Sequence, residues 1–116
     1  MTQLLLTDEQ RSQLLANGRI TAEGGDHDPQ PVVKLFTPDA HATWLLAELD
    51  PVDGDTAFGL CDIGIGMPEL GNVRISELAS IVGPLKLPIE RDLHFVAKRT
   101  LSKYARLAQI NGSIID

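Results

Sequence analysis

The sequence predicts an α+β fold, in which a small, mainly antiparallel sheet of three to five strands packs with an N-terminal, a short middle and a C-terminal helix. Three observations predict it. A segment with a helix-capping pattern comes first, short runs of β-branched and aromatic residues follow across short connections, and an apolar stripe with helical spacing comes last. Because 116 residues is a usual size for one domain, we expect residues 1–116 to form a single domain.

The first helix is predicted to begin at Thr7. Gln10 lies three residues later, the spacing at which the two side chains satisfy each other's backbone N–H groups. Asn17 and Gly18 predict its end, because glycine tolerates the left-handed conformation of a C-terminal cap. Residues 22–31 are rich in Gly, Asp and Pro and have no apolar period, so we expect a flexible loop there.

Three strands are predicted at residues 32–37, 43–49 and 56–63, each bounded by Pro, Gly or Asp. Their short connections favour an antiparallel meander. If Glu48 lies opposite Phe58, both faces of the sheet carry apolar side chains, so helices or another protein must cover each face. One predicted face holds Trp44, Leu46, Phe58 and Leu60, and the other holds Leu45, Ala47, Leu49 and Cys61.

The remaining elements are shorter. A strand at residues 72–75 precedes a helix at residues 77–82 with Ser76 as its N-cap, and a turn follows at residues 85–88. Residues 92–97 alternate as a strand with Leu93 and Phe95 inward. The last helix is predicted to begin after Thr100 and end at Gly112, with Lys103 and Arg106 in water. Its apolar stripe consists of Leu101, Tyr104, Ala105, Leu107 and Ala108.

Charge and composition exclude several classes of protein. The net charge of -6 disfavours nonspecific attraction to nucleic acid or anionic lipid. The longest apolar runs fall far short of the roughly 20 residues of a membrane span, and the N-terminus lacks a basic segment typical of secretory signals. A single cysteine fits a reducing compartment, so we expect a cytoplasmic protein. Nothing in the pattern predicts a cofactor.

Residues 59–71 contain four glycines around a strand end and its exit loop. Such loops can hold a phosphate, but Pro68 donates no backbone hydrogen bond, Glu69 would repel the ligand, and no helix start follows Gly66. We therefore interpret Gly59, Gly64, Gly66 and Gly71 as residues that shape a bulge, turns and close backbone approach.

Cys61 is a weak candidate nucleophile, for which His27, His41 or His94 would be the base. A cysteine in an apolar strand is more often a small buried side chain with a raised pKa, which is the interpretation we favour. The same four residues lack the close ligand pairs of structural zinc sites, so no metal site is predicted.

Carboxylates are the better candidates for chemistry. Asp62 is the most informative, because an acid in an apolar strand needs a partner: a base such as Arg74 or Arg91, the backbone amides of a turn, or a ligand. The candidate catalytic residues are Asp62, Glu69 and His94. The candidate binding residues are Glu48, Asp62, Glu69, Arg91 and Asp92.

Four blocks of sequence, at residues 31–39, 42–50, 57–71 and 87–95, together resemble a bacterial family known as domain of unknown function 2958. The resemblance covers most of residues 4–108. It implies a short intracellular protein, frequent on plasmids and other mobile elements, and it implies no catalytic residues.

Three functions remain open from the sequence. The first is a noncatalytic protein-interaction or accessory module of a mobile element, with inhibition of a host nuclease or defence protein as a special case. The second is a small metal-dependent or carboxylate-based hydrolase built on Asp62, Glu69 and His94. The third is a nucleic-acid binder that uses the basic face at Lys98, Arg99, Lys103 and Arg106, for which affinity would fall with salt.

Overall fold

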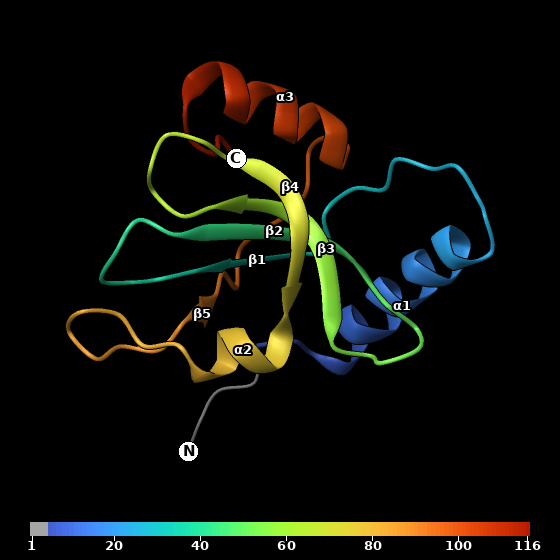
Figure 1. Cartoon of the computed structure of the whole chain (residues 1–116), viewed down its shortest axis with the longest axis horizontal. Helices are drawn as coiled ribbons and strands as arrows, with labels where there is room; N and C mark the ends of the chain where they lie inside the picture. Colours follow the sequence, from blue (N-terminus) through green and yellow to red (C-terminus); the bar gives the residue numbers. More distant parts are fainter. Residues whose placement is uncertain (1–4) are drawn as a thin grey trace.

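The computed structural model describes residues 5–116, and within that range five strands form one sheet with three helices around it (Figure 1). Every neighbouring pair of strands is antiparallel, and the order is β4-β3-β2-β1-β5. The predicted α+β fold is confirmed: β1 to β4 form a meander, and β5 returns to pair with β1. The elements are α1 (Asp8–Ala22), β1 (Val33–Phe36), β2 (Thr43–Leu49), β3 (Thr56–Asp62), β4 (Glu69–Arg74), α2 (Ile75–Ser80), β5 (Glu90–Arg91) and α3 (Leu101–Asn111).

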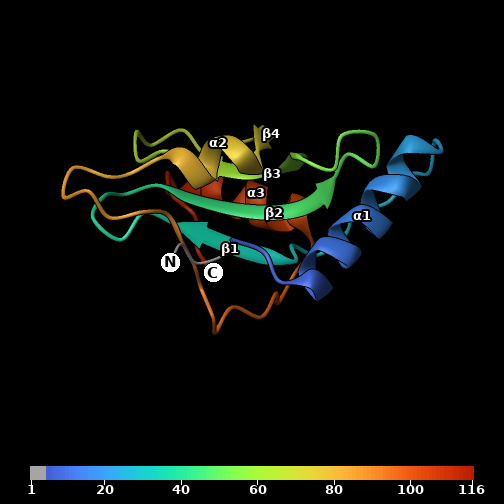
Figure 2. The ribbon, with the colours of Figure 1, turned by 90° about the horizontal axis from the view of Figure 1, so that it is seen from below.

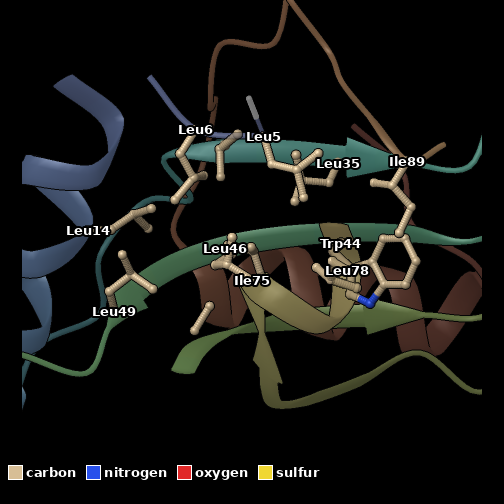
Figure 3. Close-up of a cluster of buried hydrophobic side chains, with 12 residues drawn as sticks. Leu5, Leu6, Leu14, Leu35, Trp44, Leu46, Leu49, Ile75, Leu78 and Ile89 are labelled. Atoms are coloured by element: carbon tan, nitrogen blue, oxygen red, sulfur yellow. The ribbon is translucent and has the colours of Figure 1, made fainter. Parts of the chain in front are cut away.

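The sheet buries apolar side chains on both of its faces, as the sequence predicts. α2 and α3 lie on opposite faces, and α1 lies beside one end of the sheet (Figures 1 and 2). We call the two faces the α1/α2 face and the α3 face. The α1/α2 face holds Leu5, Leu6, Leu14, Val33, Leu35, Trp44, Leu46, Leu49, Ala57, Ile75, Leu78 and Ile89 (Figure 3). The α3 face holds Leu45, Ala47, Leu60, Leu101, Tyr104, Ala105 and Ala108.

A β-bulge in β2 decides which side chains share a face. Glu48 pairs with Phe58, as predicted, but the register shifts between Leu46 and Glu48. A shift of one residue moves every side chain beyond it to the opposite face, so the predicted partition of the faces is wrong. The observed pairs before the bulge are Trp44 with Cys61, Leu45 with Leu60, and Leu46 with Gly59.

Helix α1 begins where the sequence predicts but ends later. Thr7 and Gln10 form the capping box, with both reciprocal hydrogen bonds at 3.0 Å. The predicted end at residues 17–18 is wrong, because the helix continues to Ala22. It ends in a Schellman motif around Gly24, whose φ of 83° is the left-handed conformation that glycine favours.

Asn17 and Gly18 instead fit α1 against β2. The Asn17 side-chain amide donates a hydrogen bond of 2.9 Å to the carbonyl of Ala47, the residue at the bulge. A Cβ at Gly18 would lie only 1.8 Å from the carbonyl oxygen of Leu49. Local sequence rules interpret the Asn-Gly pair as a helix end. Here the pair instead permits α1 to approach β2 closely.

The N-termini of α2 and α3 are both capped by aspartates from elsewhere in the chain. Thr100 occupies the N-cap position of α3, as predicted, whereas Arg74 rather than Ser76 occupies that of α2, and neither helix has a side-chain cap from its N-cap residue. At α2, Asp55 accepts hydrogen bonds from the Ser76 amide at 2.9 Å and the Ser76 hydroxyl at 2.6 Å. At α3, Asp28 accepts from the Ser102 amide at 3.0 Å and from the Ser102 hydroxyl. Each aspartate thus fastens a helix to a distant loop.

Two predicted boundaries are wrong in the same region. β4 begins at Glu69 rather than residue 72, and α2 occupies residues 75–80 rather than 77–82. The predicted strand at residues 92–97 is wrong as well. The backbone turns after β5, because the Asp92 carboxylate accepts a hydrogen bond of 2.9 Å from the His94 amide. Leu93 is consequently 67% exposed, while Phe95 packs against the α3 face.

Helix α3 agrees better with its prediction. Gly112 ends it with a φ of 85°, and Lys103 and Arg106 are exposed as predicted. Leu107 is the exception, because its side chain is 37% exposed rather than part of the buried stripe. None of the helices among the described residues is both long and apolar enough to cross a membrane.

Candidate functional site

Four of the predicted site residues line one open cavity of about 570 Å³. The cavity lies among β1, the tip of the β1–β2 hairpin, β5 and the segment that follows α3. Lys34 and His41 also line it. The predicted residues are Asp62, Arg91, Asp92 and His94, which come from separate parts of the sequence.

Asp62 is buried, and the structure supplies its partners. One carboxylate oxygen accepts a hydrogen bond of 2.9 Å from the Gly64 amide, and the other accepts one of 3.0 Å from the Ile114 amide. Capping of backbone amides, one of the alternatives open from the sequence, is therefore observed. Through one hydrogen bond to each of its oxygens, Asp62 holds the exit loop of β3 and the segment after α3 together.

The other charges of the cavity are largely balanced within it. The Lys34 ammonium lies 3.6 Å from the Asp92 carboxylate and also contacts the Asp116 carboxylate. Asp92 holds the turn at His94, as described above, and its amide donates to the Lys34 carbonyl at 2.9 Å. The side chain of His94 is exposed at the rim of this network. These contacts explain how β5 is held to β1, and they leave Asp92 in a structural role.

Glu48 lies in a second cavity, of about 410 Å³, near the C-terminal end of α1. It lies 3.5 Å from Nε2 of His27, and the same nitrogen lies 2.9 Å from the hydroxyl of Thr21. A carboxylate, an imidazole and a hydroxyl form the parts of a proton relay, but a relay uses both imidazole nitrogens. Here both contacts involve Nε2, so the group fastens the loop before β1 to α1 and β2. The flexibility expected of residues 22–31 stays a prediction.

Glu69 belongs to neither cavity. It opens β4, is exposed, and pairs across the sheet with Cys61. The predicted catalytic set of Asp62, Glu69 and His94 is therefore not assembled in one site. Within residues 5–116 no three His, Cys, Asp or Glu side chains form a group able to hold a metal ion.

Cys61 is half-buried against the α1/α2 face. Burial raises the pKa of its thiol, which disfavours the reactive thiolate. Of the histidines, His27 contacts Glu48 and Thr21, while His41 and His94 line the 570 Å³ cavity, which Cys61 does not line. The interpretation of Cys61 as a packed side chain agrees with this environment.

The basic residues around α3 have different surroundings. Lys98, Lys103 and Arg106 are exposed, whereas the Arg99 guanidinium stacks on the Tyr104 ring at 5.0 Å. Arg99 thus helps to cover Tyr104, whose hydroxyl accepts a hydrogen bond of 3.0 Å from the Lys98 amide. One of the four members of the basic face expected from the sequence, Arg99, is therefore partly packed onto the protein.

An apolar surface at the edge of the α3 face was not predicted. The β3–β4 loop and the C-terminal end of α3 approach each other, since a Cβ at Gly112 would lie 3.9 Å from the Gly66 carbonyl oxygen. Large apolar side chains of both segments and of β4 are exposed there. We call this surface the apolar rim, and it consists of Ile65 (65% exposed), Met67 (63%), Leu70 (41%), Leu107 (37%) and Ile110 (76%).

The sequence contains one signal for the apolar rim. Residues 63–67 alternate two isoleucines and a methionine with glycines, an unusual composition for a surface loop. Gly64 and Gly66 have φ values of 84° and 79°, so their role in shaping the turn agrees with the prediction. The exposure of their apolar neighbours depends on which elements cover them, and sequence alone does not determine that.

Comparison with known proteins identifies the family of the chain. No curated protein and no solved structure matched the chain. A family model described as "Protein of unknown function (DUF2958)" matched residues 5–115, nearly the whole chain. The resemblance seen in the sequence is thereby confirmed, and the protein belongs to the DUF2958 family.

Proposed function

We propose that this protein is a noncatalytic protein-binding module whose contact surface is the apolar rim. The observation that carries the proposal is the exposure of five large apolar side chains on neighbouring segments, with Ile110 at 76% and Ile65 at 65%. Grouped apolar surface of this kind typically marks a contact with another macromolecule. Methionine, here Met67, is also enriched at protein interfaces.

The environment of the candidate acids supports binding over catalysis. Asp62 has both oxygens in backbone hydrogen bonds, and Asp92 is paired with Lys34. Glu69 lies outside the cavity that Asp62 and His94 line. A hydrolase would need an acid and a base within reach of the same reacting atom. An accessory role in bacterial mobile elements, which the family resemblance implies, belongs to the same proposal.

Site-specific photocrosslinking tests the contact surface. A photoreactive amino acid is placed at Met67 or Ile110 in the full chain, and Val52, which is 92% exposed on the β2–β3 hairpin, provides the matched control. Leu85, 74% exposed in another loop, is a second comparison. The cross-linker is activated in lysate of the source cells, after nuclease treatment, and the adducts are identified by mass spectrometry.

We expect the same protein adduct from positions 67 and 110 and none from position 52. An Ile110→Asp substitution should abolish the adduct at position 67 while circular dichroism remains that of the folded protein. Equal adducts at all positions, or none at positions 67 and 110, would contradict the proposal. An adduct at Leu85 alone would move the contact surface to the 81–87 loop.

A further inference from the structure

The 410 Å³ cavity at the C-terminal end of α1 plays no part in the proposed function, because it shares no residue with the apolar rim. Figures 1 and 2 show α1 and the β3–β4 loop of the rim at opposite ends of the sheet. Cavities of about 300–1,000 Å³ are the usual size for small-molecule sites. The residues that line this one are Gly18, Thr21 and Ala22 of α1, Glu48, Leu49, Asp50 and Pro51 of β2 and the turn after it, and Thr56, Phe58 and Asn72 of β3 and β4.

Both charged residues that line the cavity are acids. They are Glu48 and Asp50, and no Lys, Arg or His in the described part of the chain joins them. The hairpin that begins at Asp50 adds two more acids and no base before β3. Arg11 reaches the tip of this hairpin, where it donates to the Gly54 carbonyl at 2.8 Å, and Arg74 lies near the two other acids. Neither arginine lines the cavity, so the charge on its walls is negative only.

Glu48 lacks a hydrogen-bond donor. Its side chain is only 13% exposed, and no residue that the structure describes donates a hydrogen bond to its carboxylate. The closest basic group, Nε2 of His27, lies 3.5 Å away, outside the usual range of about 2.7–3.2 Å, and the same nitrogen lies 2.9 Å from the Thr21 hydroxyl. A carboxylate withdrawn from water is costly without a donor. A ligand that enters the cavity can supply one.

The remaining walls favour an organic cation. Thr21 and Ala22 belong to the last turn of α1, and the C-terminal end of a helix has a partial negative charge that attracts cations. The ring of Phe58 attracts a cation as well, and Leu49 and Pro51 add apolar surface for an alkyl chain. A metal ion is less suited, because no three His, Cys, Asp or Glu side chains of the described residues form a group able to hold one.

We propose that this cavity binds an alkylammonium group, with the ammonium beside Glu48 and Asp50 and the alkyl chain against the apolar wall. The ammonium has three N–H donors, which supply the hydrogen bonds that Glu48 lacks. Free organic amines and the lysine side chains of proteins share this chemistry, and the experiment distinguishes the two sources. The inference goes beyond the proposed function and does not depend on it, because the cavity and the apolar rim are separate surfaces.

Three small probes with the same alkyl chain test the charge preference. Pentylamine, pentanol and pentanoate differ only in a positive, a neutral and a negative head group. A fourth probe, Nα-acetyl-lysine amide, presents the same ammonium on a protein-like backbone. Each probe is titrated into the full chain at constant pH, at low and at high salt, and binding is followed through the backbone amide signals in two-dimensional NMR spectra.

We expect pentylamine to shift the signals of residues that line the cavity and to bind about tenfold more tightly than pentanol or pentanoate, with an advantage that falls at high salt. Glu48→Gln should weaken pentylamine binding about tenfold. Glu23→Gln is the matched control, because Glu23 is an exposed acid just past α1 that does not line the cavity. Since Glu48→Gln also alters the contact with His27, Asp50→Asn provides a second variant, which should weaken binding as well. Circular dichroism and the melting temperature confirm that each chain is folded.

Three outcomes would overturn the inference. They are unchanged signals at the cavity, equal affinity for pentylamine, pentanol and pentanoate, and equal weakening by Glu48→Gln and Glu23→Gln, which would show diffuse attraction to an acidic surface. Tighter binding of pentylamine than of the lysine derivative would support a site for free amines. The reverse order would support a site for a lysine side chain of another protein.

Discussion

The two faces of the sheet are held to their helices in different ways. The α1/α2 face relies on large apolar side chains, among them Leu14, Leu46 and Leu49, all fully buried. The α3 face has a smaller apolar cluster, in which three strand residues and three helix residues, each a leucine or an alanine, pack with Tyr104. Hydrogen bonds at Asp28 and Asp62 supplement it. The difference teaches that α3 depends on a few polar contacts with distant segments.

Loss of a buried side chain on the α1/α2 face should give the largest effect. Leu46 is fully buried in β2, so Leu46→Ala should lower the free energy of unfolding by about 2–5 kcal/mol, through lost burial and the cavity left behind. Urea unfolding followed by circular dichroism measures the loss. Leu107→Ala is the control on the exposed side of α3 and should cost far less. Similar losses for both would contradict the burial assigned to these residues.

Substitution at the contact between α1 and β2 should come next. Gly18→Ala forces a Cβ against the Leu49 carbonyl, and overpacking of this kind costs about 1–3 kcal/mol. Gly71→Ala is the matched control, because a Cβ there meets no atom within 4 Å. Thermal melts of both variants provide the comparison. If Gly18→Ala were as stable as the natural protein, the close approach of α1 would be wrong.

The α3 face should respond locally to loss of its cap. Asp28→Ala removes the hydrogen bonds to Ser102 and should cost about 1 kcal/mol, the usual cost of replacing a capping residue by alanine. Hydrogen exchange should show faster exchange of α3 amides, while α1 amides keep their protection. Asp55→Ala is the control and should affect α2 instead. Equal acceleration in all three helices would show that the faces do not open separately.

Acid should give the smallest of these effects. Hydrogen bonds from Ser102 lower the pKa of Asp28, and those from Ser76 lower the pKa of Asp55. A carboxyl whose pKa is lower in the folded protein stabilises it above the unfolded value of about 3.9, and this contribution is lost as pH falls through the folded pKa. The stability difference between the natural protein and either Ala variant should therefore shrink below about pH 4. A constant difference, measured by urea unfolding across this range, would contradict the cause assigned to the shifts.

Local rules predicted the elements well and the long-range contacts poorly. The capping box at Thr7, the Glu48–Phe58 pair and the cap at Gly112 follow from nearby residues, and all three are confirmed. The end of α1 was wrong because Gly18 serves contact with β2, which is distant in the sequence. The side-chain caps expected from Ser76 and Thr100 do not form for the same reason. The aspartate that caps α3, Asp28, lies 74 residues from Ser102 in the sequence.

The candidate site shows the same difference between local contacts, which the sequence predicts, and long-range contacts, which it does not. Asp62 was identified as an acid in need of a partner, and one of its partners, Gly64, is local. The other, Ile114, lies 52 residues away, and no local pattern points to it. The apolar rim was missed because the exposure of Met67 and Ile110 depends on how far α3 extends over the sheet.

The cap at Asp28 has a consequence for the order of folding. Hairpins β1–β2, β2–β3 and β3–β4 close short loops, so their contacts form at a small cost in chain entropy. The contact of Asp28 with Ser102 joins residues 74 apart in the sequence, so we expect it to form after the hairpins. Contacts that form after the rate-limiting step control how fast a protein unfolds rather than how fast it folds. We therefore expect loss of the Asp28 cap to speed unfolding more than it slows folding.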